Sequence, residues 1–395
     1  MLRRFAFRLL ALYRNLRLFF IRLRGKTEDD IHAQRIVSGR AWNEFCDSLK
    51  AAGASLVFQG TPRDAFHQAE GHRYLTRLLR AGLEAFIEYA DPAYPILRRM
   101  VHETVKMGAD NPDNYYQNAQ ISGEFTYKIT GKRGTVHYLG FGTQKGEYGK
   151  PGGMAPSGYL EGSELQIAPD GSFEIILSTK PQPTNWLPME KETTLLIVRQ
   201  TFLDRENEVL ADLKIEKIDG EALPAPVTPK LIDEGLQSAA LLVSGASLLF
   251  SKWVKDFQKH TNQLPLFDPE VSNAAGGVAN IKYYHSHWRL APDEALLIEA
   301  NPPEDCDYWN FQLNNYWMES LDYRYFTIHI NKHTARYRPD GSVRIIVAHQ
   351  HPGLENWITT VGHTEGTMCF RWSNSQINPQ PHTKVVKFAD LKKLD

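Results

Sequence analysis

The stretch DGSVRIIVAHQHPGLENWI, residues 340–358, repeats an earlier stretch of the chain, DGSFEIILSTKPQPTNWL, residues 170–187. Each begins with Asp-Gly-Ser, continues through an aliphatic run to an Asn-Trp pair, and is followed by an arginine, Arg199 or Arg371. The spacings of these features agree to within one residue. Asp-Gly is typical of hairpin turns, and short aliphatic runs are typical of buried strands. The same β-rich unit therefore occurs twice, at about residues 115–199 and 284–371.

Length and composition limit the class of protein. A chain of 395 residues predicts two or three domains. The formal net charge of −1 gives no general attraction to nucleic acid, and no nucleic-acid-binding motif occurs. The cysteines Cys46, Cys306 and Cys369 form no CxxC pair, which argues against a zinc ribbon or a disulfide framework. Reduced thiols favour a cytoplasmic protein.

The amino-terminal segment differs from the rest of the chain. Before the first acid, Glu28, come eight basic residues, and the apolar residues between them share one helical face. Residues 1–27 are therefore predicted to form a basic amphipathic helix. Two interpretations remain open: a helix on an anionic membrane surface or a partner, or a helix packed on its own protein. A mitochondrial presequence is a weaker alternative, and no apolar run is long enough to span a bilayer.

The remaining chain divides by its periodicity. Residues 28–114 are predicted to be helical, 115–223 to form a first β-sandwich, 224–280 a linker with helices, and 281–395 a second β-sandwich. Residues 142–158 are glycine-rich and are predicted to form a long surface loop. The expected fold class is α+β, with two jelly-roll-like β-sandwich domains from an internal duplication, each preceded by helices.

Several motifs also resemble a known family. They are EGHRYLTR (70–77), DNPD (110–113), NWL (185–187), HPGLENW (351–357) and GHTEGTMCFRW (362–372). Together they resemble the bacterial family called domain of unknown function 1214, which is related to family 1254, over most of the chain from about residue 40. The resemblance implies a jelly-roll-like β fold and supplies no catalytic residues.

The duplication separates structural from functional candidates. Features kept in both copies, the Asn-Trp pairs and the arginines Arg199 and Arg371, are predicted to be structural: asparagine bonds the backbone at a corner and tryptophan fills the core. Features found in one copy only are better functional candidates. The second copy alone has paired histidines and a run of amide side chains.

The paired histidines suggest a metal site. His349 and His351 would share one face of a strand, where two imidazoles can bind a divalent metal, and His363 could add a third ligand. His285 and His287 have the same spacing. The alternative is that these histidines bond backbone carbonyls at loop ends. A divalent metal is the one cofactor that the sequence suggests.

The amide run suggests a ligand groove. On a strand over residues 308–314, Tyr308, Asn310 and Gln312 share one face with Asn314, and apolar side chains share the other. Amides beside flat aromatic rings such as Trp317 suit a saccharide or another small polar ligand. The alternative is a strand whose amides face solvent.

Two functions follow from these features. One is an enzyme acting on a saccharide or small polar ligand in the second β domain, with Glu319, His351 and His363 transferring protons. The other is a non-catalytic binding or interaction protein, held at a membrane surface by residues 1–26. The sequence is compatible with both functions and does not indicate an oligomeric state.

Overall fold

The computed structural model describes residues 27–146, 153–220, 224, 226–278 and 280–393. The amphipathic helix predicted for residues 1–26 lies outside these residues. The helices are α2 (Glu28–Val37), α3 (Arg40–Ala52), α4 (Ala65–Leu83), α5 (Pro229–Phe257) and α6 (Pro269–Ala274), with short helical turns at Gly53–Val57, Glu84–Glu88, Gly162–Glu164, Gln258–His260 and Phe388–Lys393. Across the described part of the chain, no helix has the length and apolar character needed to cross a membrane.

The first sandwich contains eight strands in two sheets. They are β1 (Asn114–Gln120), β2 (Tyr127–Lys132), β3 (Tyr138–Gly146), β4 (Met154–Glu161), β5 (Ser172–Ser178), β6 (Trp186–Pro188), β7 (Thr193–Thr201) and β8 (Asp212–Lys217). The sheet orders are β1-β7-β3-β4 and β6-β5-β2-β8. Apolar side chains from both sheets, including Ile129, Phe141 and Val198, form one buried core between them.

The second sandwich repeats this plan. Its strands are β9 (Ile281–Arg289), β10 (Glu294–Ala300), β11 (Tyr308–Asn314), β12 (His329–Asn331), β13 (Val343–Ala348), β14 (Trp357–Thr359), β15 (Glu365–Ser373) and β16 (His382–Lys387). The sheet orders are β12-β11-β15-β9 and β14-β13-β10-β16, so strand n of the first sandwich corresponds to strand n + 8 of the second. The α+β class and the two β-sandwiches are thereby confirmed.

The Asn-Trp corners have the same structure in both sandwiches. Asn185 and Asn356 adopt positive φ angles of 44° and 55°. The amide of Asn356 donates to the carbonyls of Arg336 and Arg344 and accepts the Arg336 N–H, and Asn185 makes the same three bonds in its own sandwich. These asparagines therefore have the structural role that the sequence predicts.

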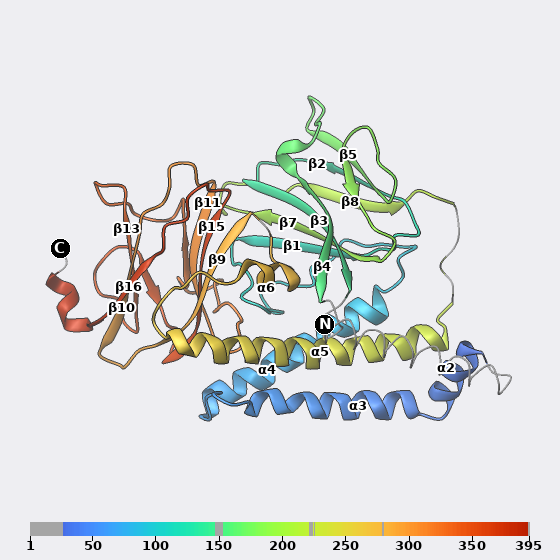
Figure 1. Ribbon diagram of the computed structural model, residues 1–395, viewed down its shortest axis with the longest axis horizontal. Helices are drawn as coiled ribbons and strands as arrows, with labels where there is room; N and C mark the ends of the chain where they lie inside the picture. The colour runs from blue at the N-terminus through green and yellow to red at the C-terminus, as the bar shows by residue number, and fades with distance from the viewer. Residues whose placement is uncertain (1–26, 147–152, 221–223, 225, 279, 394–395) are drawn as a thin grey trace, which may run out of the picture.

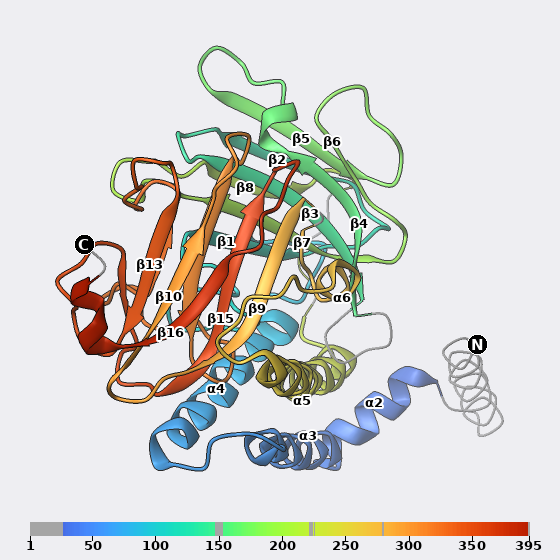
Figure 2. The ribbon, with the colours of Figure 1, turned by 60° about the vertical axis from the view of Figure 1, so that its left-hand side comes forward.

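The helices form a layer beneath both sandwiches. The long helix α5, of 29 residues, runs under the first and second sandwiches alike, and α3 and α4 pack along it (Figure 1, Figure 2). At Gly82 of α4 a side-chain carbon would lie 3.0 Å from the Ala239 Cα of α5, so glycine permits this close crossing. The short helix α6 contacts both β4 and β9, which places it at the junction of the sandwiches.

Two predicted segments differ from the structure. The helical region ends at Glu88 and not near residue 114, because Pro92 and Pro95 follow and cannot continue a helix. Residues 142–158 are not one loop, since β3 extends to Gly146 and β4 begins at Met154. Strand β4 requires glycine at position 158, because a side-chain carbon there would lie 2.1 Å from the Pro188 carbonyl oxygen.

Candidate functional site

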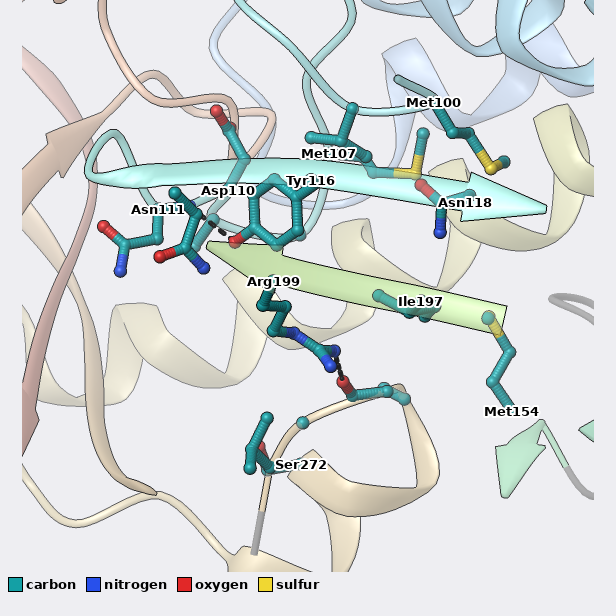
Figure 3. A pocket seen from close by; sticks show the side chains of 18 of the residues that line it. Met100, Met107, Asp110, Asn111, Tyr116, Asn118, Met154, Ile197, Arg199 and Ser272 are labelled. Atoms are coloured by element: carbon teal, nitrogen blue, oxygen red, sulfur yellow. Dashed lines mark hydrogen bonds between the residues drawn. The ribbon is translucent and has the colours of Figure 1, made fainter. Parts of the chain in front are cut away.

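A cavity of about 200 Å³, here called the interdomain cavity, lies where the two sandwiches meet α5 and α6 (Figure 3). Its wall includes side chains of β1 and β7 from the first sandwich and of β9 and β15 from the second. Residues 100–111, α5 and the segment from Ser272 to Val278 complete it. Cavities at domain junctions are common sites for small ligands.

Each sandwich places one tyrosine–arginine pair on the wall of this cavity. Tyr116 of β1 lies directly opposite Arg199 of β7, and Tyr283 of β9 lies directly opposite Arg371 of β15. Because β1 and β7 correspond to β9 and β15, the pairs occupy equivalent positions in the duplicated unit. The cavity thus receives the same two residue types from each copy.

The two arginines differ in their hydrogen bonds. Arg371, with 4% of its surface exposed, donates to the side-chain oxygens of Asn310 and Gln312 and to the Ala109 carbonyl. Arg199 donates one bond, of 2.8 Å, to the Gly276 carbonyl (Figure 3). A guanidinium has five N–H donors. Among the described residues, every hydrogen-bond acceptor of the two arginines is a neutral oxygen, so the positive charge on this wall has no direct counter-ion.

The two phenols on the wall each accept one hydrogen bond from the backbone. The Tyr116 hydroxyl accepts the Asn111 N–H at 3.1 Å, and the Tyr283 hydroxyl accepts the Val278 N–H at 3.4 Å. Neither hydroxyl has an acceptor in the described part of the chain. Burial raises the pKa of both phenols, although Arg371 and Arg199 oppose the shift, so both stay protonated at neutral pH.

One carboxyl group, that of Asp110, belongs to the described lining, and it is engaged elsewhere. Its two oxygens accept the backbone N–H and the hydroxyl of Ser320, at 2.9 and 2.8 Å. Burial raises the pKa of Asp110, against the opposing effect of Lys106. Asp110 therefore does not pair with either arginine by a direct bond.

The rest of the wall is largely apolar. Strand β7 becomes apolar along the cavity. Arg199 lies opposite Tyr116 of β1, and Ile197 and Leu195 lie opposite the next residues on the same face, Asn118 and Gln120. The other apolar residues of the lining include Phe86, Met100, Val101, Met107, Met154, Leu242, Phe250, Trp253, Val278 and Ile281. Figure 3 shows Met100, Met107 and Met154 around Asn118 and Ile197. Methionine side chains adapt to varied apolar shapes. The cavity therefore has a cationic part and an apolar part.

The amide face of β11 is filled by the protein itself. The predicted alternation is confirmed, since Trp309, Phe311 and Leu313 lie in the core of the second sandwich. Asn310 donates to the Asn111 side chain at 2.8 Å, and Gln312 donates to the Asp110 carbonyl at 2.9 Å. Further contacts of this face are Tyr308 to Asp113 and Gln312 to Asn314. This face is neither an open groove nor exposed to solvent.

The other residues predicted for ligand binding and proton transfer do not come together. The Trp317 ring stacks on Tyr74 in the core between the helices and the second sandwich. Glu319 is paired with Arg77 at 2.6 Å, and burial raises the pKa of its carboxyl group. His363 is paired with Glu70 of α4 at 2.7 Å. His351 accepts a backbone N–H within its own loop. The three predicted catalytic residues thus have separate surroundings.

Of the two histidine pairs, His287, His349 and His351 have ordinary hydrogen-bond partners. His349 contacts the Thr360 hydroxyl at 2.8 Å and the Ala291 carbonyl at 3.1 Å, while His287 contacts Glu365 at 3.0 Å. Within the described ranges, no three histidine, cysteine or acidic side chains are grouped to hold a metal. The arrangement around His349 matches the alternative that the sequence left open, a histidine bonded to a backbone carbonyl.

The sequence did not identify the tyrosine–arginine pairs as a site. Arg199 and Arg371 were predicted to be structural because they recur in both copies. The feature that indicates the site is a tyrosine that recurs with each arginine. Tyr116 pairs with Arg199 on the neighbouring strand, and Tyr283 pairs with Arg371 in the same way. A site at the junction of two copies uses the same position of each, so recurrence alone does not mark a residue as structural.

Comparison with known proteins agrees with the fold. A crystal structure of an uncharacterised protein from Burkholderia cenocepacia is 51% identical, covers 90% of this chain and 99% of that chain, and superposes with a TM-score of 0.89. The VPA0106 protein from Vibrio parahaemolyticus is 9% identical, covers 80% of this chain and 98% of that chain, and has a TM-score of 0.45. No curated protein matches.

The family comparison agrees with the duplicated β units. The model of the family described as "protein of unknown function (DUF1214)" matches residues 155–201 and 291–376. The first range lies in the first sandwich, from β4 to β7, and the second spans most of the second sandwich. The chain belongs to the DUF1214 family.

Proposed function

We propose that the protein binds a small organic anion, a carboxylate with an apolar body, in the interdomain cavity. The observation that supports this most strongly is the presence of Arg199 and Arg371 on one wall with no carboxylate partner among the described residues. Arg371 is buried and Arg199 is partly buried, and a buried positive charge is costly unless it is paired. An anion would supply that partner, and the phenols of Tyr116 and Tyr283 would donate to its oxygens.

Arg199 is the residue that would bind the anion directly. Arg371 already donates to three protein acceptors, whereas Arg199 donates to the Gly276 carbonyl alone. Arg199 also borders a second cavity of about 340 Å³ between the sandwiches, with Asn114 and Asn111. Arg371 would contribute mainly through its charge.

The size of the cavity favours a compact ligand. An engineered apolar cavity of about 150 Å³ binds benzene, so a cavity of about 200 Å³ suits a ligand the size of a medium-chain fatty acid. The apolar wall around Met100, Met107 and Met154 would hold the chain. Octanoate is therefore a suitable probe.

The function we propose for the interdomain cavity is ligand binding and not catalysis. Glu319, His351 and His363 have separate partners. A saccharide on the amide face of β11 would find Asn310 and Gln312 already bonded to the protein. The geometry therefore favours a ligand-binding protein over the saccharide enzyme that the sequence suggested.

Calorimetric titration of octanoate into the wild type and Arg199→Gln tests the proposal. The loss of a charged hydrogen bond predicts about 10- to 100-fold weaker binding of octanoate to Arg199→Gln. Arg338→Gln, which changes an arginine bonded to Glu299 on the second sandwich, is the matched control and should bind as the wild type does. Equal affinity of the wild type for octanoate and neutral octanol, or an unchanged affinity in Arg199→Gln, would overturn the proposal.

A further inference from the structure

Two buried polar atoms on the cavity wall have no partner. They are Asn118 Oδ1 and His285 Nδ1, on side chains whose residues are each 6% exposed. Neither atom has a hydrogen bond among the described residues. Buried polar atoms are bonded in the great majority of cases, and one left unpaired costs about 1–3 kcal/mol. Two such atoms on one cavity therefore point to a ligand with a hydrogen-bonding group.

The two residues occupy equivalent positions of the duplicated unit. Asn118 follows Tyr116 by two residues on β1, and His285 follows Tyr283 by two residues on β9. Asn118 pairs with Ile197 in the sheet, and His285 pairs with Cys369. Each therefore lies two residues along its strand, on the same face, from the tyrosine of a tyrosine–arginine pair. The unpaired atoms therefore recur at the same position of the two strands.

The His285 ring has a fixed position and a neutral charge. It stacks on Phe257 and Tyr283, with ring centroids 5.5 and 5.7 Å away. Burial, with a smaller effect of Arg371, lowers the pKa of His285 to about 3. Its Nε2 is 3.9 Å from the Cys369 sulfur. In either neutral tautomer Nδ1 remains able to accept or to donate one bond.

We infer that the ligand of the interdomain cavity carries a hydroxyl group on its chain, at some distance from the carboxylate, and that Asn118 binds this hydroxyl. The inference rests on the proposed function. A hydroxyl can donate a hydrogen bond, which the Asn118 carbonyl oxygen can accept. A keto group only accepts and would leave Asn118 Oδ1 unpaired.

The strand geometry places the hydroxyl on the chain. Positions two residues apart on a strand are separated by about 7 Å, which corresponds to several carbon–carbon bonds. A carboxylate at Arg199 and Tyr116 would then have its hydroxyl near Asn118 well beyond the carbon that follows the carboxyl group. The chain end would continue towards Leu195 and Met154.

Three acids of one chain length test this inference by calorimetry: octanoate, 2-hydroxyoctanoate and 5-hydroxyoctanoate. The wild type should bind 5-hydroxyoctanoate about tenfold more tightly than octanoate, as one added hydrogen bond predicts. 2-Hydroxyoctanoate places its hydroxyl beside the carboxylate and should show no gain. Equal affinity for octanoate and 5-hydroxyoctanoate overturns the inference.

Two variants assign the gain to residues. Asn118→Leu keeps the size of the side chain, and His285→Phe keeps the ring stacking. The gain of 5-hydroxyoctanoate over octanoate should shrink in Asn118→Leu and persist in His285→Phe, while octanoate binding shows that each is folded. A full gain in Asn118→Leu also overturns the inference. If Arg199→Gln still weakens the binding of octanoate, only the inference about the hydroxyl is refuted. If Arg199→Gln has no effect on octanoate binding, the proposed function fails as well.

Discussion

Asn185 and Asn356 adopt a left-handed backbone conformation that residues other than glycine and asparagine rarely take. Each compensates with side-chain bonds to the backbone of two earlier segments of its sandwich. The sequence predicted this role from the recurrence of Asn-Trp. The prediction succeeded because the hydrogen-bond partners of each corner lie within 20 residues of it, inside the same repeated unit.

Two substitutions of Asn356 separate the contribution of its side-chain hydrogen bonds from the cost of its backbone strain. Asn356→Ala loses the hydrogen bonds and keeps the strained φ, so we expect a loss of about 2–3 kcal/mol in the free energy of unfolding. Asn356→Gly relieves the strain and should lose less. Urea unfolding monitored by tryptophan fluorescence measures both. Asn43→Ala, at an exposed position of α3, is the control; an equal loss in the glycine and alanine variants would contradict the role of strain.

Helix α4 is held against the second sandwich by ionic contacts. Glu70 pairs with His363 at 2.7 Å, and Arg77 pairs with Glu319 at 2.6 Å. Burial acts to raise the pKa of Glu70, but His363 and Arg73 outweigh it and the pKa is lowered. A carboxyl group with a lowered pKa stabilises the folded state above its unfolded pKa, and the contribution disappears as the pH falls through the folded value.

Glu70→Gln should therefore show a pH-dependent loss of stability. At pH 7 we expect a loss of about 1–3 kcal/mol, the usual contribution of a charged hydrogen bond. The difference from the wild type should begin to shrink below the unfolded glutamate pKa of about 4.3 and vanish at lower pH. Urea midpoints measured from pH 7 to pH 3 follow this change. Exposed Glu192→Gln should show no difference, and a loss in Glu70→Gln that is constant with pH would refute the mechanism.

Strand β11 shows where prediction from sequence reaches its limit. Its alternation correctly identified Trp309, Phe311 and Leu313 as core. The opposite face contacts Asp110 and Asn111, which lie about 200 residues earlier in the chain. Periodicity tells which side chains share a face, but not what covers that face. For the same reason His363 could not be paired with Glu70 before the helix was placed.

The molecule as a whole is needed to form the interdomain cavity. The first sandwich contributes Tyr116 and Arg199, the second contributes Tyr283 and Arg371, and α5 and α6 close the wall. A ligand bound there contacts elements from both halves of the chain. Its binding free energy therefore stabilises the assembled molecule and not one sandwich alone.

Ligand binding should raise the stability of both sandwiches together. At a concentration of 100 times its dissociation constant, octanoate should stabilise the protein by about 2.7 kcal/mol. Hydrogen exchange should slow in β7 and in β15 alike. Arg199→Gln at the same octanoate concentration serves as the control and should gain less. Protection confined to one sandwich would contradict a site shared between them.

The duplicated architecture has a consequence for how such a site could arise. One copy of the β unit supplies one tyrosine and one arginine, which is half of the charged wall. A shorter chain with a single copy could complete that wall only by pairing with a second molecule. Fusion of the two copies makes the pairing permanent and frees the halves to diverge, as Asn118 and His285 have done at one matching position. An ancestral homodimer interface would then have become the interior of one polypeptide.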